Sequence, residues 1–304
     1  ACGTAYHAGL FGKDLFEKVL GVPVSVELAS EFRYREPIVG KNDLGIVISQ
    51  SGETMDTIAA TELLKENGSH VLALVNVVGS SLARMADSVF YLHVGPEIGV
   101  ASTKAYLGML VSQLVLAKHW DSKNRLDVSF DEIAELPNLI DKTMACEDQI
   151  KEISEKIYKK NDIYFIGRGL DYALAAEGAL KLKEISYLHA EALAAGELKH
   201  GTLALIEEGT PVVVTASQNH LLDKTTSNVQ EVIARGAYVI AIGDSESEKL
   251  ENISNDYVTL PDSNEILTTV ISIIPLQFIA YHVANKNGQS IDQPRNLAKS
   301  VTVE

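Results

Sequence analysis

The residues best suited to chemistry form a short turn of small, hydroxylated residues, Ser49–Thr54, with the sequence SQSGET. It holds three hydroxyls, one amide and one glycine. A helix beginning at Thr54 would present unpaired N–H groups and the positive end of its dipole, which hold a phosphate without any lysine. A plain helix cap, with Glu53 in the first turn, is the alternative. A cap needs only one hydroxyl, so we predict an anion site.

A second candidate set lies on the helix expected over 171–187. Glu177, Lys181 and Glu184 are four and three residues apart, so they share one face of that helix. A solvated ladder of ion pairs is the commoner meaning of such spacing. The surrounding alanines and leucines leave little room for an exposed face, and a carboxylate buried beside a lysine can act as a general base. The spacing leaves both interpretations open.

Two further candidates lie near Gly201 and at the carboxyl end of the chain. His200 ends a short helical stretch and could act as its C-terminal cation or as a proton shuttle. No other His or Cys has the spacing of a metal site, so none is expected. Lys299 lies in the tail 292–304. A desolvated lysine there could attack a carbonyl, although an interface strap is the alternative interpretation.

Composition narrows the classes of function. The length of 304 residues predicts two domains of roughly 150 residues each. A formal net charge of −15 disfavours binding to nucleic acid or to a membrane surface. The two cysteines, Cys2 and Cys146, exclude a disulfide framework and suit a reducing cytoplasm. The apolar stretch 267–284 contains Pro275, Gln277 and His282, which favours a buried helix over a membrane span.

The elements that must position these residues alternate between strand and helix. Leu44–Ser49 is the near-continuous apolar run expected of a parallel strand covered on both faces. We predict the other strands of the first half over 22–28, 71–75 and 89–94, and helices over 5–20, 54–67, 80–86 and 101–119. This alternation predicts an α/β fold with a doubly wound parallel sheet. No strand precedes the first helix, so we expect a segment upstream of Ala1.

The second half of the sequence repeats the first at a spacing of 166 residues. The spacing pairs Gly3 with Gly169, Glu31 with Glu197 and Ser49 with Thr215. We therefore expect two tandem domains, over 1–130 and 161–290, joined by a charged helix over 131–160 and followed by a tail over 291–304. The second copy has TASQNH in place of SQSGET, without the glycine, so we expect one phosphate site per chain. Gly167-Arg168-Gly169 lacks the third glycine of a dinucleotide fingerprint, and no cofactor is expected.

Seven segments together carry a resemblance to a known family. They are ACGT at 1–4, ELASEFRYR at 27–35, SQSGET at 49–54, EIGVASTKA at 97–105, EGALKLKEISYLHAE at 177–191, AAGELKHG at 194–201 and DQPRNLAKSVTVE at 292–304. Through them the whole chain resembles the isomerase portion of the glutamine:fructose-6-phosphate amidotransferases. The resemblance implies two sugar isomerase (SIS) domains of flavodoxin-like fold.

The resemblance also implies a role for each candidate residue. Lys299 would form a Schiff base with the C2 carbonyl of fructose 6-phosphate, and Glu184 would carry a proton between C1 and C2. Lys181 would stabilise developing negative charge, and His200 of a neighbouring subunit would open the sugar ring. The remaining implied contacts are to the phosphate, from Ser49, Gln50, Ser51 and Thr54, and to the sugar, from Cys2, Gly3, Thr4, Val100, Ser102 and Ala298.

The same resemblance implies partners for the chain. Members of the family are cytoplasmic homodimers that form glucosamine 6-phosphate, or glucose 6-phosphate without ammonia. An amino-terminal glutaminase domain supplies the ammonia, and no such domain lies within these residues. Cys2 belongs to the ACGT loop and is not its nucleophile. A protein of these residues alone would isomerise sugar phosphates but make amino sugar poorly from glutamine. A non-catalytic module that senses sugar phosphates is the rival, but it would have no use for Glu184, His200 or Lys299.

Overall fold

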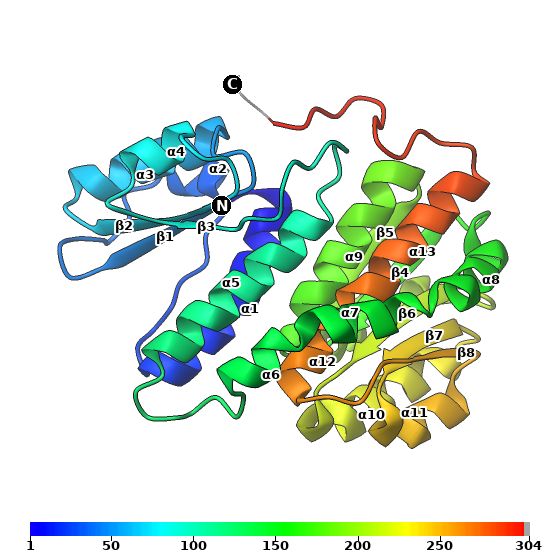
Figure 1. Ribbon diagram of the computed structural model, residues 1–304. Helices are drawn as coiled ribbons and strands as arrows, with labels where there is room; N and C mark the ends of the chain where they lie inside the picture. The colour runs from blue at the N-terminus through cyan, green and yellow to red at the C-terminus, as the bar shows by residue number, and fades with distance from the viewer. Residues whose placement is uncertain (301–304) are drawn as a thin grey trace. The chain divides into compact units, whose positions relative to one another are not determined.

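The computed structural model describes residues 1–300, which fall into two compact units (Figure 1). The first unit comprises Ala1–Arg125 together with the tail from Asn296, and the second comprises Leu126–Arg295. Each unit is an α/β structure built on one sheet of parallel strands. The fold class expected from the sequence is therefore confirmed.

The first unit has a three-stranded sheet in the order β1 (Leu44–Ser49), β2 (His70–Val75) and β3 (Ser88–Tyr91). From Val71 to Val75 every β2 side chain is buried, because helices lie over both faces of the sheet. Those helices are α1 (Gly3–Leu20), α2 (Ala29–Phe32), α3 (Met55–Glu66), α4 (Ser81–Met85) and α5 (Lys104–Trp120). The strand β1 therefore ends at the predicted anion turn, and α3 begins directly after it.

The strand expected over 22–28 is wrong, because this segment is extended but pairs with no other strand. Its Val24 N–H donates to the Glu17 side chain instead, at 2.9 Å. The corresponding strand of the second unit, β5 (His189–Ala194), pairs only with β4 (Asp162–Gly167). No described residue of the first unit occupies the place of β4, so the segment has no ladder to join.

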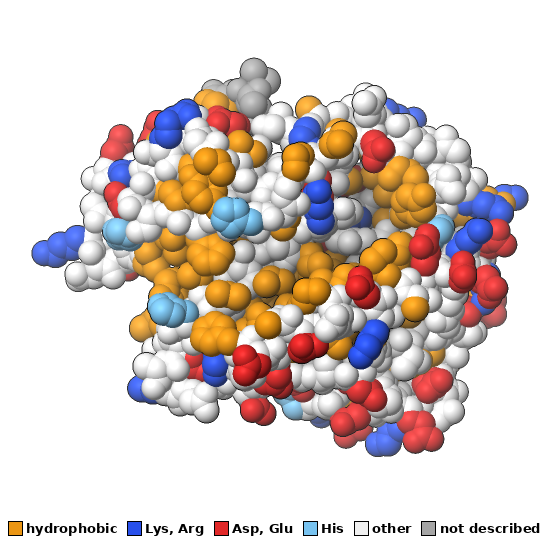
Figure 2. All heavy atoms as spheres, in the orientation of Figure 1, with side chains coloured by type: hydrophobic (Ala, Val, Ile, Leu, Met, Phe, Trp, Pro, Cys, Tyr) orange, Lys and Arg blue, Asp and Glu red, His pale blue; other side chains and the backbone are white. Residues whose placement is uncertain are grey.

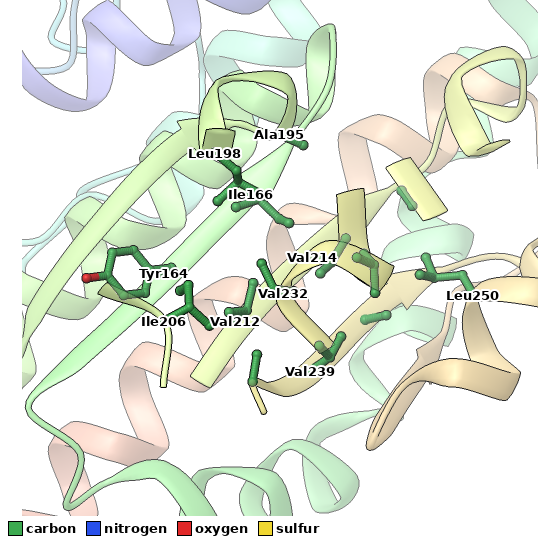
Figure 3. Packing of buried hydrophobic residues seen from close by; sticks show 14 residues of the cluster. Tyr164, Ile166, Ala195, Leu198, Ile206, Val212, Val214, Val232, Val239 and Leu250 are labelled. Atoms are coloured by element: carbon green, nitrogen blue, oxygen red, sulfur yellow. The ribbon is translucent and has the colours of Figure 1, made fainter. Parts of the chain in front are cut away.

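The second unit has a five-stranded sheet in the order β5-β4-β6-β7-β8. The three strands not yet introduced are β6 (Pro211–Ala216), β7 (Tyr238–Gly243) and β8 (Asp256–Thr259). Five helices of this unit follow its first strand: α9 (Leu170–Ser186), α10 (Leu222–Ile233), α11 (Glu248–Ile253), α12 (Glu265–Ile271) and α13 (Ile273–Lys286). Figure 3 shows part of the core, where Ile166, Val212, Val214 and Val239 of three adjacent strands meet Val232 of α10.

The single charged helix expected over 131–160 is also wrong, because three shorter helices replace it. They are α6 (Phe130–Ala134), α7 (Leu136–Met144) and α8 (Glu147–Ile157), and all three belong to the second unit. Ser129 and Glu132 form a reciprocal capping box that starts α6. Pro137 lies in the first turn of α7, where its missing N–H costs nothing and where a new helix begins readily.

The internal repeat is visible in the backbone of α1 and α9. Each helix begins beside a glycine with positive φ, which is +51° at Gly3 and +55° at Gly169. Each helix is also followed by a left-handed residue, Gly21 at φ +68° and Tyr187 at φ +63°. The two residues of each pair are 166 positions apart. The two halves therefore start and end this helix at equivalent positions.

Surface composition agrees with the acidic character of the sequence. On the face drawn in Figure 2, acidic and basic side chains are intermixed and no continuous basic patch is seen. The segment Glu265–Lys286 is long and apolar enough to cross a membrane, but 72% of its most apolar window is buried inside the structure. That burial is expected of a core helix, as predicted for 267–284.

Candidate functional site

The turn Ser49–Thr54 folds its own hydroxyls inward and leaves a main-chain donor open. The Gly52 N–H donates to Ser49 Oγ at 3.0 Å, and the Glu53 N–H donates to Ser51 Oγ at 3.2 Å. Thr54 is the N-cap of α3, but its side chain makes no capping hydrogen bond. Among residues 1–300 the Ser51 N–H has no acceptor. The plain helix-cap alternative therefore fails, while an open donor beside a helix N-terminus fits an anion site.

Gly52 is required by the shape of this turn. Its φ is +68°, which side chains rarely adopt, and an added Cβ would lie 2.1 Å from Ser80 Oγ. Ser80 cannot easily move away, because its Oγ accepts the Ala83 N–H at the start of α4. The glycine therefore lets the turn approach α4 closely.

A cavity of about 550 Å³ opens beside Gln50 in the first unit. One wall comes from the loop between β3 and α5, where His93 has a φ of +53°, a strained value for a residue other than glycine. Val100 and Ser102, the predicted sugar-lining residues, lie later in the same loop and are partly buried. The residues lining the cavity are Gln50, Asn76, Val77, His93, Gly95, Pro96 and Glu97. The volume suits a small polar ligand.

The tail brings Lys299 to the loop that carries Ser102. Lys299 Nζ donates to Ser102 Oγ at 3.4 Å and lies 3.5 Å from Glu97 Oε2. The Glu97 side chain is only 5% exposed, and its Oε1 accepts the Thr103 N–H at 2.7 Å. The structure therefore joins Lys299 and Ser102, two predicted site residues almost 200 positions apart, and adds Glu97, which the sequence did not single out. The one signal in the sequence that could have pointed to Glu97 is that it is a lone acidic residue in a glycine-rich loop.

The remaining predicted contacts of the first unit lie at two places. Cys2 is the N-cap of α1, and Gly3 and Thr4 form its first turn. Ala298 is exposed in the tail, next to Lys299. Their roles stay predictions, because no observation in the described residues tests them.

In the second unit, α9 carries a buried charged cluster rather than a solvated ladder. Lys181 Nζ lies 2.5 Å from Glu184 Oε2 and 3.4 Å from Glu177 Oε1. The side chains of Glu177 and Lys181 are 0% and 2% exposed, whereas Glu184 is 21% exposed. Burial by itself would lower the pKa of Lys181, but attraction to Glu177 and Glu184 outweighs it and raises that pKa. Lys181 is thus a fixed cation, and Glu184 is the carboxylate that reaches solvent.

His200 lies at the end of η1 (Ala195–His200) and is exposed. Gly201, which follows it, has a φ of +148° and ends the short helix. Within the described part of the chain, the His200 ring makes no hydrogen bond. No group of three or more His, Cys, Asp or Glu among residues 1–300 could hold a metal ion.

The turn after β6, at 215–220, is closed by carboxylates of its own unit. The Ser217 N–H donates to Asp171 Oδ2 at 3.0 Å, and Ser217 Oγ donates to Oδ1 at 2.6 Å. The Asn219 N–H donates to Glu265 Oε2 at 2.9 Å. Burial raises the pKa of Asp171 to about 6, against the opposing hydrogen bonds from Ser217 and Gln218. Sequence patterns missed this feature, because a single aspartate in a helix carries no signal of its burial.

Comparison with known proteins places both halves in one family. The model of the SIS domain matches residues 1–118 and 156–285, which is most of the chain. The chain is 49% identical to a glutamine–fructose-6-phosphate aminotransferase [isomerizing] of Clostridium tetani and 50% identical to that of Pyrococcus horikoshii. These matches cover 100% and 99% of this chain but 51% of each relative. The chain therefore spans about half the length of the curated relatives that it matches.

A solved structure matches over nearly the same length. It is the C-terminal domain of glucosamine-fructose-6-phosphate aminotransferase from Francisella tularensis, with a TM-score of 0.91 and 41% identity. The match covers 96% of this chain and 84% of that one. A glucosamine-6-phosphate deaminase from Thermotoga maritima, at 24% identity and a TM-score of 0.80, shares the fold. The chain thus belongs to the SIS-domain family and, within it, to the C-terminal isomerase halves of the glutamine–fructose-6-phosphate aminotransferases.

Proposed function

We propose that this chain binds fructose 6-phosphate and converts the ketose to an aldose through Lys299. The supporting observation is that the first unit contains both a main-chain donor without an acceptor, the Ser51 N–H, and the amine of Lys299. In this proposal the turn Ser49–Thr54 holds the phosphate, with Gln50 at the edge of the cavity. Val100, Ser102, Ala298 and the start of α1, Cys2 to Thr4, line the sugar.

The covalent step uses the amine of Lys299. Its nitrogen adds to C2 of the open-chain sugar, the C2 oxygen leaves as water, and a C=N bond forms. Ammonia then adds to C2 and releases the Lys299 amine, leaving C2=NH. Glu184 removes a proton from C1 and delivers it to C2. The C2 nitrogen gains a proton and becomes the amine, and O1 loses its proton and becomes the aldehyde oxygen of glucosamine 6-phosphate. Without ammonia, the same proton transfer on fructose 6-phosphate gives glucose 6-phosphate.

The other residues have supporting roles in this proposal. The buried ammonium of Lys181, held by Glu177, stabilises the negative charge that develops on the sugar while Glu184 moves the proton. His200 is contributed by a second copy of the chain in a homodimer and opens the sugar ring. This agrees with its exposure and with the absence of a partner for its ring among residues 1–300.

The proposal extends to the setting of the chain. A glutaminase domain supplies ammonia in the full-length protein, as the names of the relatives imply, and the enzyme works in the cytoplasm without nucleic acid or membrane. The second candidate is a module that binds a sugar phosphate without converting it. The buried Lys181 cluster favours the enzyme, because a sensor has no use for a carboxylate poised beside a fixed cation.

Lys299→Ala tests the enzyme against the sensor. We expect formation of glucosamine 6-phosphate from fructose 6-phosphate and ammonia to fall to background, while the Kd for fructose 6-phosphate, measured by calorimetry, changes by no more than about threefold. Lys41→Ala, which removes an exposed lysine of the same unit, is the control and should leave both quantities unchanged. Unchanged turnover in Lys299→Ala would discard the imine. Binding without turnover in the unaltered protein would establish the sensor.

A further inference from the structure

Tyr187 occupies a backbone position that suits glycine better than tyrosine. It follows α9 in the left-handed conformation, with φ +63°. Its counterpart in the first half, 166 residues earlier, is Gly21 with φ +68°. Left-handed residues at helix ends are commonly glycine, because any side chain there adds steric strain. A strained tyrosine that persists where glycine would fit directs attention to what its side chain does.

The Tyr187 side chain contacts Arg295, the residue at which the chain leaves the second unit. Its hydroxyl accepts the main-chain N–H of Arg295 at 2.8 Å. The Arg295 guanidinium lies over the tyrosine ring, 4.2 Å from the ring centroid. Arg295 is the last residue of the second unit, and Asn296, with φ +60°, is the first residue of the tail that groups with the first unit.

The tail beyond this point has few other restraints before Lys299. Asn296, Leu297 and Ala298 are exposed, and no hydrogen bond of theirs is found in the part of the chain that the structure describes. Lys299 lies four residues after Arg295 and next meets Ser102 and Glu97. Motion of the backbone at Arg295 would therefore move the Lys299 amine, because the residues between them make no hydrogen bond that would prevent it.

We propose that Tyr187 is a positioning residue for the Schiff-base reaction, acting by clamping Arg295 so that the short segment to Lys299 presents its amine in one place. The inference rests on the proposed role of Lys299. The same tyrosine directly follows the helix that carries Glu184, three residues earlier in the sequence. A restrained nucleophile reacts faster, because less conformational freedom must be lost at the reaction step.

Three variants separate the contributions of the clamp. Tyr187→Gly removes both contacts and also relieves the left-handed strain, so its unfolding temperature should not fall. Tyr187→Phe removes the hydroxyl acceptor but keeps the ring, and Arg295→Ala removes the stacked guanidinium but keeps the N–H. Tyr172→Phe, which alters an exposed tyrosine of the same helix, is the matched control. We would measure kcat, KM, the thermal unfolding midpoint, and the rate at which borohydride traps the sugar adduct on Lys299, read by mass spectrometry.

For Tyr187→Gly, kcat and the trapping rate should fall about fivefold or more, with KM within about twofold of normal. Tyr187→Phe and Arg295→Ala should show smaller falls in the same two quantities, and Tyr172→Phe none. The clamp is overturned if Tyr187→Gly keeps the normal kcat and trapping rate, or if activity is lost only in step with a lowered unfolding midpoint. Failure of the proposed function would look different, because the unaltered protein would then yield no trapped adduct on Lys299.

Discussion

The turns at 49–54 and 215–220 occupy equivalent places in the two halves, yet the equivalent N–H groups of Ser51 and Ser217 differ in their partners. The Ser51 N–H has no acceptor among residues 1–300, whereas its counterpart, the Ser217 N–H, is bonded to Asp171. Asp171 corresponds to Ala5, which offers no carboxylate at this place. A second carboxylate, Glu265, takes the Asn219 N–H. Equivalent turns thus leave the Ser51 N–H open in one half and bond the Ser217 N–H to a carboxylate in the other.

Backbone conformation differs between the two turns in the same sense. Gly52 has a φ of +68° and lies close against Ser80, whereas its counterpart Gln218 has a φ of −108° and carries a side chain that reaches back to Arg168 O at 2.7 Å. Side chains of the second unit thus occupy donors and space within its own turn. The comparison explains why one phosphate site per chain is expected, and the following experiments test it.

The largest expected effect is on substrate affinity when the first turn loses its hydroxyls. The double variant Ser51→Ala, Thr54→Ala should raise KM for fructose 6-phosphate about a hundredfold or more, because two hydrogen bonds to a charged group are lost. Steady-state kinetics measures this. Ser217→Ala in the second turn is the matched control, and a comparable rise in KM there would refute the distinction between the turns.

An effect of similar size should appear in stability as Asp171 titrates. Its pKa is raised to about 6, chiefly by burial, so the folded state binds this proton more tightly than the unfolded chain. The free energy of unfolding should therefore decline between pH 4 and pH 6 by about 3 kcal/mol and then level off. Asp171→Asn should lack this decline. Chemical denaturation at several pH values compares the two proteins, and equal slopes would mean that the pKa of Asp171 is not raised in the folded state.

The smallest effect should follow from placing the second turn's carboxylate in the first. Ala5 is buried and equivalent to Asp171, so Ala5→Asp should let a carboxylate compete for the Ser51 N–H. We expect affinity for fructose 6-phosphate to weaken about tenfold, with Ala5→Asn as the uncharged control. Calorimetry at pH 8 gives both values. Equal affinities in the two variants would show that charge at this position does not control the site.

Local patterns in the sequence predicted the parts of the structure that depend on local interactions. The strand at 44–49, the turn after it and the helix after that all follow from the run of apolar residues, the glycine and the hydroxyls. The predicted strand at 22–28 failed, because a strand also needs a neighbour, which no local pattern supplies. The prediction of one helix over 131–160 was wrong because it followed the pattern of charged residues. It gave too little weight to Ser129 and Pro137, which mark the starts of separate helices.

Features that depend on tertiary contacts were beyond the reach of the sequence. Burial decided the interpretation of Lys181, since identical spacing fits a solvated ladder and a buried cluster equally well. Glu97 and Tyr187 matter because they contact Lys299 and Arg295, respectively. Both partners are distant in sequence, so no local pattern indicates these contacts. The proposed chemistry of Lys299 came from the resemblance, and the structure adds its contact with Ser102 and the clamp at Arg295.

The most direct test of the account is a crystal structure with fructose 6-phosphate bound. We predict the phosphate on the first turn, within hydrogen-bond distance of the Ser51 N–H, with Ser217 still bonded to Asp171. A phosphate bound at Thr215–Asn219, with the first turn empty, would contradict the account.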